Sequence, residues 1–450
     1  MTDPASIDRI RPRDREAIVS SLRAGVVPLA GQQHIQVGRA AEVKALTADI
    51  DRVAGGGTSV RFIIGEYGAG KTFFLQLVRS IALTRRLVTM HADLTPERRL
   101  QASGGQARNL YAELVRNMAT RTKPEGGALS AVVERFVTLA IAEAKERGSS
   151  PENAISTRLS SLSELVGGYD FATVIGAYWR GFDSGEDQVK SDAIRWLRGE
   201  FTTKTDARTA LGVRTIIDDD NWYDHLKLLA RFVLLAGFVG LLIELDELVN
   251  LYKLSHSISR NANYEQILRL LNDALQGGAE RLGWVMGGTP DFLLDTHRGL
   301  YSYPALQSRL AENDLATGAL VDYSGPIIRL ANLTPNELYV LLEKVRHVYA
   351  GGDTSKYLVG DDALSGFMDH CAIRIGDAYF RTPRTTIKEF VNLLAILDQN
   401  PGTDWRTVVG DIDIRSDTNP DLVPLPAKFD TVSVGTGTPA GGDGLATFQL

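Results

Sequence analysis

The chain of 450 residues is 44% hydrophobic and 23% charged, and it carries a formal net charge of −6. These proportions are those of a globular protein, and the length allows two or three domains. The negative net charge excludes a general attraction to polyanions, so contact with nucleic acid would need a local basic patch.

The sequence indicates a soluble protein of the cytoplasm without membrane association. No secretory signal opens the chain, and its longest apolar run, residues 232–243, is shorter than the roughly 20 residues that span a bilayer. The one cysteine, Cys371, is expected to be a small core residue rather than a reactive thiol. The seven histidines are scattered, which predicts no zinc site.

Residues 1–30 are expected to form a helical segment. Arginines at positions 9, 11, 13 and 15 alternate there with acidic residues, which favours a solvated helix face over a phosphate-binding patch. The segment VGRAAE, residues 37–42, then precedes a helix that carries Val43 and Leu46 on one face.

The stretch GEYGAGKT, residues 65–72, fits the pattern G-x-x-x-x-G-K-[ST] at every fixed position. An apolar, β-branched run before it predicts a buried strand, and apolar residues at helical spacing follow it. Such a loop turns backbone N–H groups toward phosphate oxygens at a helix N-terminus, while Lys71 reaches the β- and γ-phosphates and Thr72 binds Mg²⁺. The predicted phosphate-binding loop consists of Gly65, Glu66, Tyr67, Gly68, Ala69, Gly70, Lys71, Thr72 and Phe73.

A second strand is predicted over VTMHAD, residues 88–93, and the next strand begins far along the chain. The intervening residues have helical patterns, although a short connection would suffice to link two strands. We therefore predict a helical insertion over residues 121–225 on a core formed by residues 31–120 and 226–325. The insertion could carry partner specificity or could be a stabilising bundle.

The apolar run GLLIEL leads directly into Asp246 and Glu247. An aspartate at the end of a buried strand is the usual partner of a P-loop, because its carboxylate steers Mg²⁺. Glu247 could polarise a water molecule in line with the γ-phosphate, or it could simply begin the next helix, where an acidic residue suits the dipole. Glu244 should point to the same side of the strand as Asp246.

The polar stretch after this strand contains Lys253, His256 and Arg260. In a ring of subunits, it could touch DNA phosphates without reading sequence. The alternative is a solvated loop that connects two helices.

A further strand is predicted over LGWVMGG, and Thr289 follows it. Thr289 could sense the γ-phosphate or could belong to an ordinary turn at the strand end. Arg309, on an exposed turn or helix downstream, could reach the γ-phosphate of a neighbouring subunit, although surface arginines in salt bridges are more common.

Residues 326–402 are predicted to form a helical lid, in which Pro383 and Arg384 precede an apolar helix. From about residue 403, the sequence becomes rich in Gly, Pro, Thr and Asp and loses its helical period. Residues 403–450 are expected to form an extended acidic tail.

In their order along the chain, these motifs resemble those of AAA+ ATPases of the origin-recognition and Cdc6-type branch. The resemblance implies an α/β fold with a three-layer P-loop core, a parallel sheet and a helical lid. It also implies that Val37, Gly38 and Arg39 line the adenine pocket, that Asp246 and Glu247 hydrolyse ATP, and that Arg384 reaches the phosphates. Thr289 departs from the pattern, because asparagine is usual there.

A closer resemblance is to ATP-binding proteins of BREX-type phage-defence loci in bacteria. The stretches SLRAGVVPLAGQQHIQVGR, FIIGEYGAGKTFFLQLVRSIAL and ADLTPERRLQ carry it. It implies ATP hydrolysis in phage defence, with a helicase or other defence protein as partner.

Two uses of hydrolysis are left open. The protein could be a homo-oligomeric motor or loader that acts on double-stranded DNA, or it could be a switch whose nucleotide controls the binding of a protein partner. A P-loop kinase is disfavoured, because Glu247 suits water better than an alcohol as the acceptor.

Overall fold

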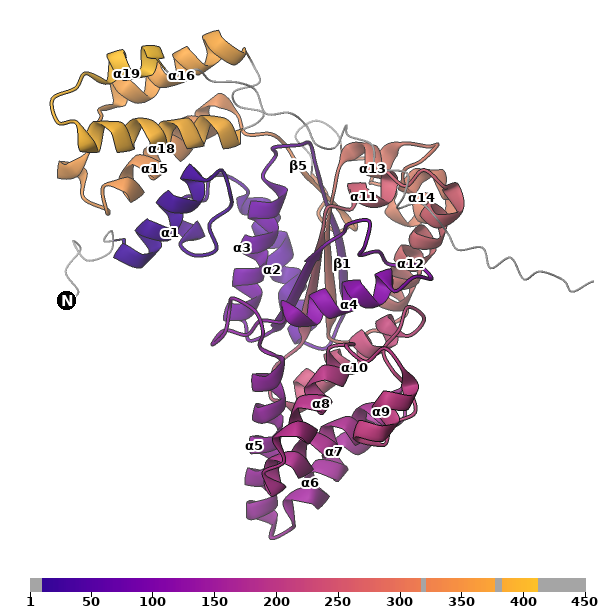
Figure 1. Cartoon of the computed structure of the whole chain (residues 1–450). Coiled ribbons are helices and arrows are strands. Elements are labelled where there is room, and N and C mark those ends of the chain that lie inside the picture. The colour runs from indigo at the N-terminus through magenta and orange to yellow at the C-terminus, as the bar shows by residue number, and fades with distance from the viewer. Residues whose placement is uncertain (1–9, 317–320, 377–382, 412–450) are drawn as a thin grey trace, which may run out of the picture.

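The computed structural model describes residues 10–316, 321–376 and 383–411. Most of the predicted tail lies outside these residues, but its first part, which was expected to be extended, forms a helix over Trp405–Asp411. At the centre is a parallel five-stranded sheet in the order β2-β3-β4-β1-β5 (Figure 1). Its strands are β1 (Ser59–Gly65), β2 (Val88–Asp93), β3 (Leu241–Asp246), β4 (Leu282–Gly288) and β5 (Ile327–Leu330). The predicted α/β class and parallel sheet are confirmed.

Helices cover both faces of this sheet. On one face, α2 (Ala40–Ala54) and α3 (Lys71–Thr84) share a hydrophobic core with β1, β3, β4 and β5. The other face packs against α4 (Gln106–Arg116), α10 (Trp222–Leu235) and α12 (Ser257–Leu275). Burial on both faces explains why the strands are nearly continuous apolar runs.

Two strands depart from this apolar pattern on one face only. In β2 and β3, the residues Met90, Ala92, Ile243 and Leu245 belong to the core on the α10 side. The alternate positions, which face α3, include Glu244 and Asp246, both of which are buried. The two carboxylates of β3 therefore lie under the helix that begins at the P-loop.

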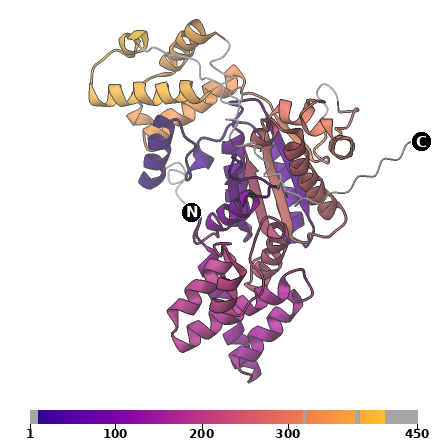
Figure 2. The ribbon, with the colours of Figure 1, turned by 45° about the vertical axis from the view of Figure 1, so that its right-hand side comes forward.

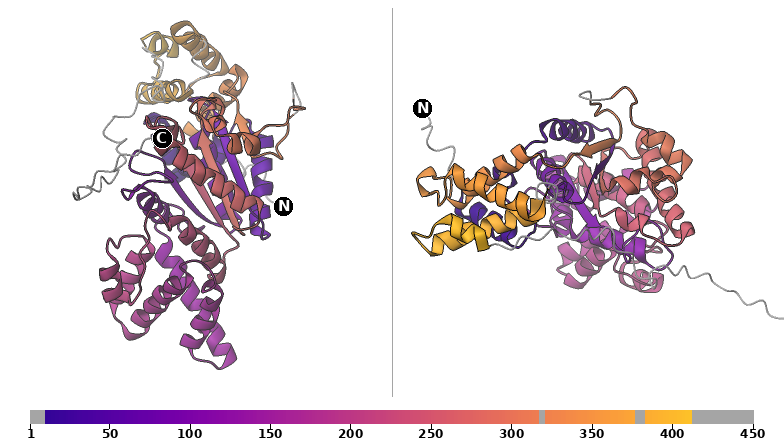
Figure 3. Two further views of the ribbon diagram at one scale, coloured as in Figure 1. Left: turned by 90° about the vertical axis from the view of Figure 1, so that its right-hand side faces the viewer. Right: turned by 90° about the horizontal axis from the view of Figure 1, so that it is seen from above.

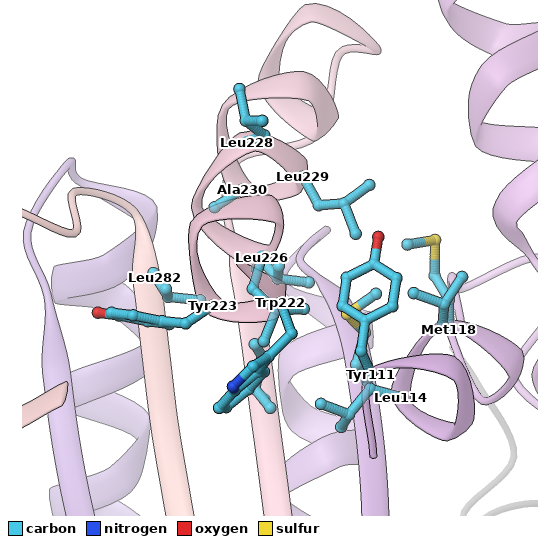
Figure 4. Packing of buried hydrophobic residues seen from close by; sticks show 14 of the residues in the cluster. Tyr111, Leu114, Met118, Trp222, Tyr223, Leu226, Leu228, Leu229, Ala230 and Leu282 are labelled. Carbon is cyan, nitrogen blue, oxygen red and sulfur yellow. The ribbon is translucent and has the colours of Figure 1, made fainter. Parts of the chain in front are cut away.

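Helix α10 lies beside α4 on the face of the sheet opposite α3. Figure 4 shows Trp222 and Tyr223 at its start, close to the strands, and Leu229 facing Tyr111 of α4. Trp222 and Tyr223 are both only 1% exposed. Burial of large side chains of this kind, at about 25 cal/mol per Å² of apolar surface, is the main force that holds the layers together.

Between α4 and α10, five helices project away from the sheet (Figures 1 and 3). They are α5 (Leu129–Arg147), α6 (Pro151–Leu159), α7 (Gly168–Ser184), α8 (Asp187–Leu197) and α9 (Lys204–Leu211). Their buried side chains are continuous with the core on the α10 side of the sheet. The expected helical character of this region is confirmed.

At the opposite end of the sheet, the C-terminal helices pack around the first helix, α1 (Pro12–Arg23) (Figures 2 and 3). These helices are α15 (Pro335–Tyr349), α16 (Asp361–Ile375), α18 (Pro383–Gln399) and α19 (Trp405–Asp411). Ile18 of α1 and Cys371 of α16 are fully buried in this shared core. Burial raises the pKa of the Cys371 thiol to about 12, as expected for a core residue.

Short helices link these parts: α11 (Val249–Tyr252), α13 (Pro290–Leu294) and α14 (Pro304–Leu310). Among the described residues, none of the helices has the length and apolar character to span a bilayer.

Candidate functional site

A cavity of about 240 Å³ lies at the carboxyl edge of the sheet, below α1 and α18. It brings together most of the site residues that the sequence predicts. Those that line it are Val37, Arg39, Tyr67, Gly68, Ala69, Gly70, Lys71, Thr72, Phe73, Asp246, Glu247, Thr289 and Arg384.

The phosphate-binding loop leads from β1 into α3. Gly68 and Gly70 have φ angles of 83° and 81°, in the left-handed region that glycine adopts without steric cost. Lys71 Nζ donates hydrogen bonds to the carbonyl oxygens of Gly65 and Glu66, at 2.8 and 3.0 Å. Because α3 begins at Lys71, its first N–H groups lie at the cavity, where they can bind an anion.

Thr72 and Asp246 form the candidate metal site. Thr72 Oγ1 donates a hydrogen bond to Asp246 Oδ2 over 2.8 Å. Magnesium binds oxygen octahedrally at 2.0–2.1 Å, so two adjacent ligands lie about 2.9 Å apart. The spacing and chemistry of these two oxygens therefore fit Mg²⁺.

The second carboxylate oxygen of Asp246 is also held in place. Asp246 Oδ1 accepts a hydrogen bond from the backbone N–H of Glu247, at 2.9 Å. The carboxylate lies against Gly287 of the neighbouring strand β4, where an added Cβ would come within 2.4 Å of Oδ1. In the sequence, Gly287 is only part of a strand end, whereas in the structure it provides the space that Asp246 occupies.

Glu247 lines the cavity with an exposed side chain and an unusual backbone conformation. Its φ angle is 59°, in the left-handed region that is rare for residues with a Cβ. The next helix, α11, begins only at Val249, so Glu247 does not occupy the first turn of a helix. Strain of this kind is often found at functional sites.

Thr289 lies at the end of β4, between the P-loop strand β1 and the Asp246 strand β3. Its hydroxyl accepts a hydrogen bond from the N–H of Phe292 and so caps α13. Thr289 thus has the local role of a strand-end residue and also lines the cavity.

Under α3, a buried ion pair lies next to the metal site. Arg79 Nη2 lies 2.7 Å from Glu244 Oε2, and the Glu244 side chain is 1% exposed. Burial raises the pKa of Glu244 to about 7, while the Arg79 guanidinium acts in the opposite direction. Glu244 is on the same side of β3 as Asp246, as predicted. Arg79 was not identified from the sequence, since nothing local relates it to Glu244.

The segment Val37–Gly38–Arg39 lies between the sheet and α15. Gly38 does not line the cavity; its φ is 64°, and an added Cβ would come within 2.7 Å of Glu337 Oε1. Arg39 donates a hydrogen bond to the carbonyl of Ala331 and lies 3.7 Å from Glu42. These contacts fix the segment against α15, α2 and the residue that follows β5.

Residues 22–28, at the end of α1, form an unpredicted wall of the cavity. Leu22, Gly25, Val26, Val27 and Pro28 line it together with Arg384 of α18. A Cβ on Gly25 would lie 3.6 Å from Arg384 Cγ, which shows how closely the two segments approach. In the sequence, the stretch RAGVVP is distinguished only by its resemblance to BREX proteins. That resemblance is the one feature of the sequence that points to a role for these residues at the site.

Other predicted residues lie outside the cavity lining. Gly65 ends β1, and Glu66 contributes its carbonyl to Lys71. Arg309, on α14, is exposed and donates hydrogen bonds to Asn272 Oδ1 and the Ala305 carbonyl.

The prediction that Arg260 belongs to an exposed, DNA-contacting or solvated loop is wrong. Arg260 lies on α12 and is 7% exposed, and its guanidinium donates to the carbonyl of Leu254. The same carbonyl accepts a hydrogen bond from Arg298. Arg260 therefore fixes the segment that follows Glu247 instead of facing solvent.

A family model described as "BREX system ATP-binding protein BrxC/D" matches residues 10–413 of the chain. This match covers every element that surrounds the cavity. No protein with a curated description matches the chain.

Proposed function

The chain belongs to the family of BREX system ATP-binding proteins BrxC/D, and we propose that it is a Mg²⁺-dependent ATPase of the AAA+ type. Its family implies a role in phage defence and other defence proteins as partners. The observation that carries the proposal is the placement of Thr72, Asp246 and Glu247 around one cavity with the P-loop. A site that only bound nucleotide would not need Glu247.

In the proposed reaction, the N–H groups of the loop and the Lys71 ammonium bind the phosphate oxygens of ATP. Thr72 and Asp246 would hold Mg²⁺, which would supply neutralisation of the charge on the bound phosphates. The Glu247 carboxylate orients a water molecule and accepts its proton as the water attacks the γ-phosphorus. Catalysis would then come mostly from positioning and from stabilisation of the developing charge.

Residues at the rim complete the site in this proposal. Thr289 would sense the γ-phosphate, and Arg384 would contact the phosphates from the lid. Val37, Gly38 and Arg39 would hold the base, with residues 22–28 as the facing wall. Arg309 would complete the site of an adjacent subunit, so the active form would be a homo-oligomer. The predicted boundary at residue 325 is wrong, because β5 pairs with β1 and belongs to the core sheet. In this proposal residues 31–120 and 226–330 form the ATPase core, residues 121–225 the insertion, and the helices from α15 onward the lid.

We further propose that hydrolysis drives a motor or loader on double-stranded DNA, with a helicase as one kind of partner. A second candidate is a switch in which the nucleotide controls a protein-binding surface. The burial of Arg260 favours the switch, because it removes one of the cations expected to meet DNA.

The test is ATP hydrolysis by the purified protein with and without double-stranded DNA, with Glu247→Gln as the blank. DNA stimulation that is lost in the variant would support the motor, and it should weaken with added salt. Slow turnover indifferent to DNA would support the switch. Turnover in Glu247→Gln equal to that of the wild type would refute the assignment of Glu247.

A further inference from the structure

The buried pair Arg79–Glu244 has no role in the proposed reaction, yet it lies next to the metal site. Arg79 Nε and Nη2 approach the same carboxylate oxygen, Glu244 Oε2, at 2.9 and 2.7 Å. The Arg79 and Glu244 side chains are 15% and 1% exposed. A charged pair this well buried is not a solvent-screened surface contact.

The pair joins the same two elements as the candidate metal ligands. Thr72 and Arg79 are seven residues apart on α3, which is two helical turns, so they lie on one side of the helix. Glu244 and Asp246 are two residues apart on β3 and share one side of the strand. Two contacts therefore connect α3 to β3 in series: Thr72–Asp246 at the cavity and Arg79–Glu244 beneath it.

We infer that Arg79 and Glu244 are positioning residues that hold α3 against β3, so that Thr72 Oγ1 and Asp246 Oδ2 keep the spacing of adjacent Mg²⁺ ligands. This inference rests on the proposed Mg²⁺-ATP site. Magnesium demands nearly ideal octahedral geometry, so a small displacement of α3 weakens its binding. A directional ion pair fixes the relation of helix and strand more closely than an apolar contact of the same area does.

The experiment separates positioning from stability with one pair of substitutions. Glu244→Met leaves the Arg79 charge unpaired, and Arg79→Met leaves the buried Glu244 carboxyl without its hydrogen-bond donor, whereas the double variant leaves neither and should recover thermal stability. ATP binding is titrated with Mg²⁺, and hydrolysis and thermal unfolding are measured in parallel. We expect the half-saturating Mg²⁺ concentration to rise about tenfold in both single variants and to stay raised in the double variant. ATP binding in EDTA should not change.

A second buried pair supplies the control. Arg61 Nε of β1 lies 2.5 Å from Asp49 Oδ2 of α2, with side chains 6% and 4% exposed. Arg61→Met with Asp49→Met should leave the Mg²⁺ requirement at its wild-type value. The conservative variant Glu244→Gln, which retains an oxygen that can accept from Arg79, should be shifted less than Glu244→Met.

Three outcomes would overturn the inference. If the double variant recovers both stability and Mg²⁺ affinity, the pair only stabilises the fold. If Arg79→Met lowers the half-saturating Mg²⁺ concentration, the main effect of Arg79 is to repel the metal ion and not to position its ligands. If ATP binding by the wild type does not depend on Mg²⁺, the metal site itself is wrong. A different result would refute the ATPase proposal and leave the inference intact: the wild type binds ATP in a Mg²⁺-dependent way and the variants raise the half-saturating Mg²⁺ concentration as expected, but no ATP is hydrolysed.

Discussion

Glu247 combines a strained backbone with the carboxylate proposed to activate water. Its φ of 59° is left-handed, which costs an L-residue about 1–2 kcal/mol. Glycine avoids this cost but loses about 0.5–1 kcal/mol more chain entropy than alanine does. Glu247→Ala keeps the strain and Glu247→Gly relieves it, so the glycine variant should be the more stable by roughly 0.5–1 kcal/mol. This order is the reverse of the one in helices and strands.

The assay is urea unfolding of both variants, compared by midpoint at equal slope. Tryptophan fluorescence reports on the relevant region, because Trp284 of β4 is paired in register with Ile243 of β3. Both variants keep the backbone N–H that donates to Asp246, so both should bind ATP with Mg²⁺ and fail to hydrolyse it. Greater stability of the alanine variant would refute the claim that strain is retained here for the sake of the side chain.

Further predictions concern three other positions. Gly287→Ala should abolish Mg²⁺-dependent hydrolysis, because the added Cβ would lie 2.4 Å from Asp246 Oδ1. Gly283→Ala on the same strand is the control. Its added Cβ would approach only a flexible leucine methyl group, at 2.9 Å, so hydrolysis should be retained. Burial lowers the pKa of His91 from its ordinary value of 6.5 to about 3. Between these two pH values, the unfolded chain therefore binds one proton more at His91 than the folded chain does. Urea unfolding should therefore show a loss of about 2 kcal/mol from pH 7 to pH 5, and most of this loss should be absent in His91→Asn. Arg309→Ala should reduce hydrolysis without weakening ATP binding. Mixing this variant with inactive Glu247→Gln subunits should restore activity, because the Glu247→Gln subunit supplies an intact Arg309 to a neighbour with an intact Glu247. If activity does not recover, Arg309 has no role in trans.

The parts of the fold that sequence predicted are those with a complete local signal. The strand before the P-loop, helix α3 and the strand that ends in Asp246 each have an apolar run bounded by a motif or a turn. Strand β5 was missed because it has only four residues, one of them the exposed Arg329. It becomes a strand by pairing with β1 at the sheet edge, and that contact is not visible in a local pattern.

The same distinction applies to the site. Lys71, Thr72, Asp246 and Glu247 are found by contiguous motifs, whereas Gly287 matters only because β4 lies beside β3. The Arg79–Glu244 pair joins positions 165 residues apart. The polar stretch around Arg260 predicts solvent exposure, but this side chain is buried and its guanidinium donates to the carbonyl of Leu254. The burial and the role of such residues therefore depend on tertiary contacts, which a local sequence pattern does not show.

The division of the hydrophobic cores indicates which parts can respond to the nucleotide. The insertion helices share one core with the sheet, so they should move with it as a unit. Helix α1 and the C-terminal helices form a separate core, which reaches α3 only through partly buried residues such as Phe73. The cavity lies between these two bodies, with Glu247 on one and Arg384 on the other. A ligand shifts the equilibrium between two conformations only if its contacts differ between them. The nucleotide contacts both cores in this site, so loss of the γ-phosphate should change the position of α1 and the C-terminal helices relative to the sheet. The lid with α1 would then be the part that moves with the state of the nucleotide, while the insertion keeps its position relative to the sheet.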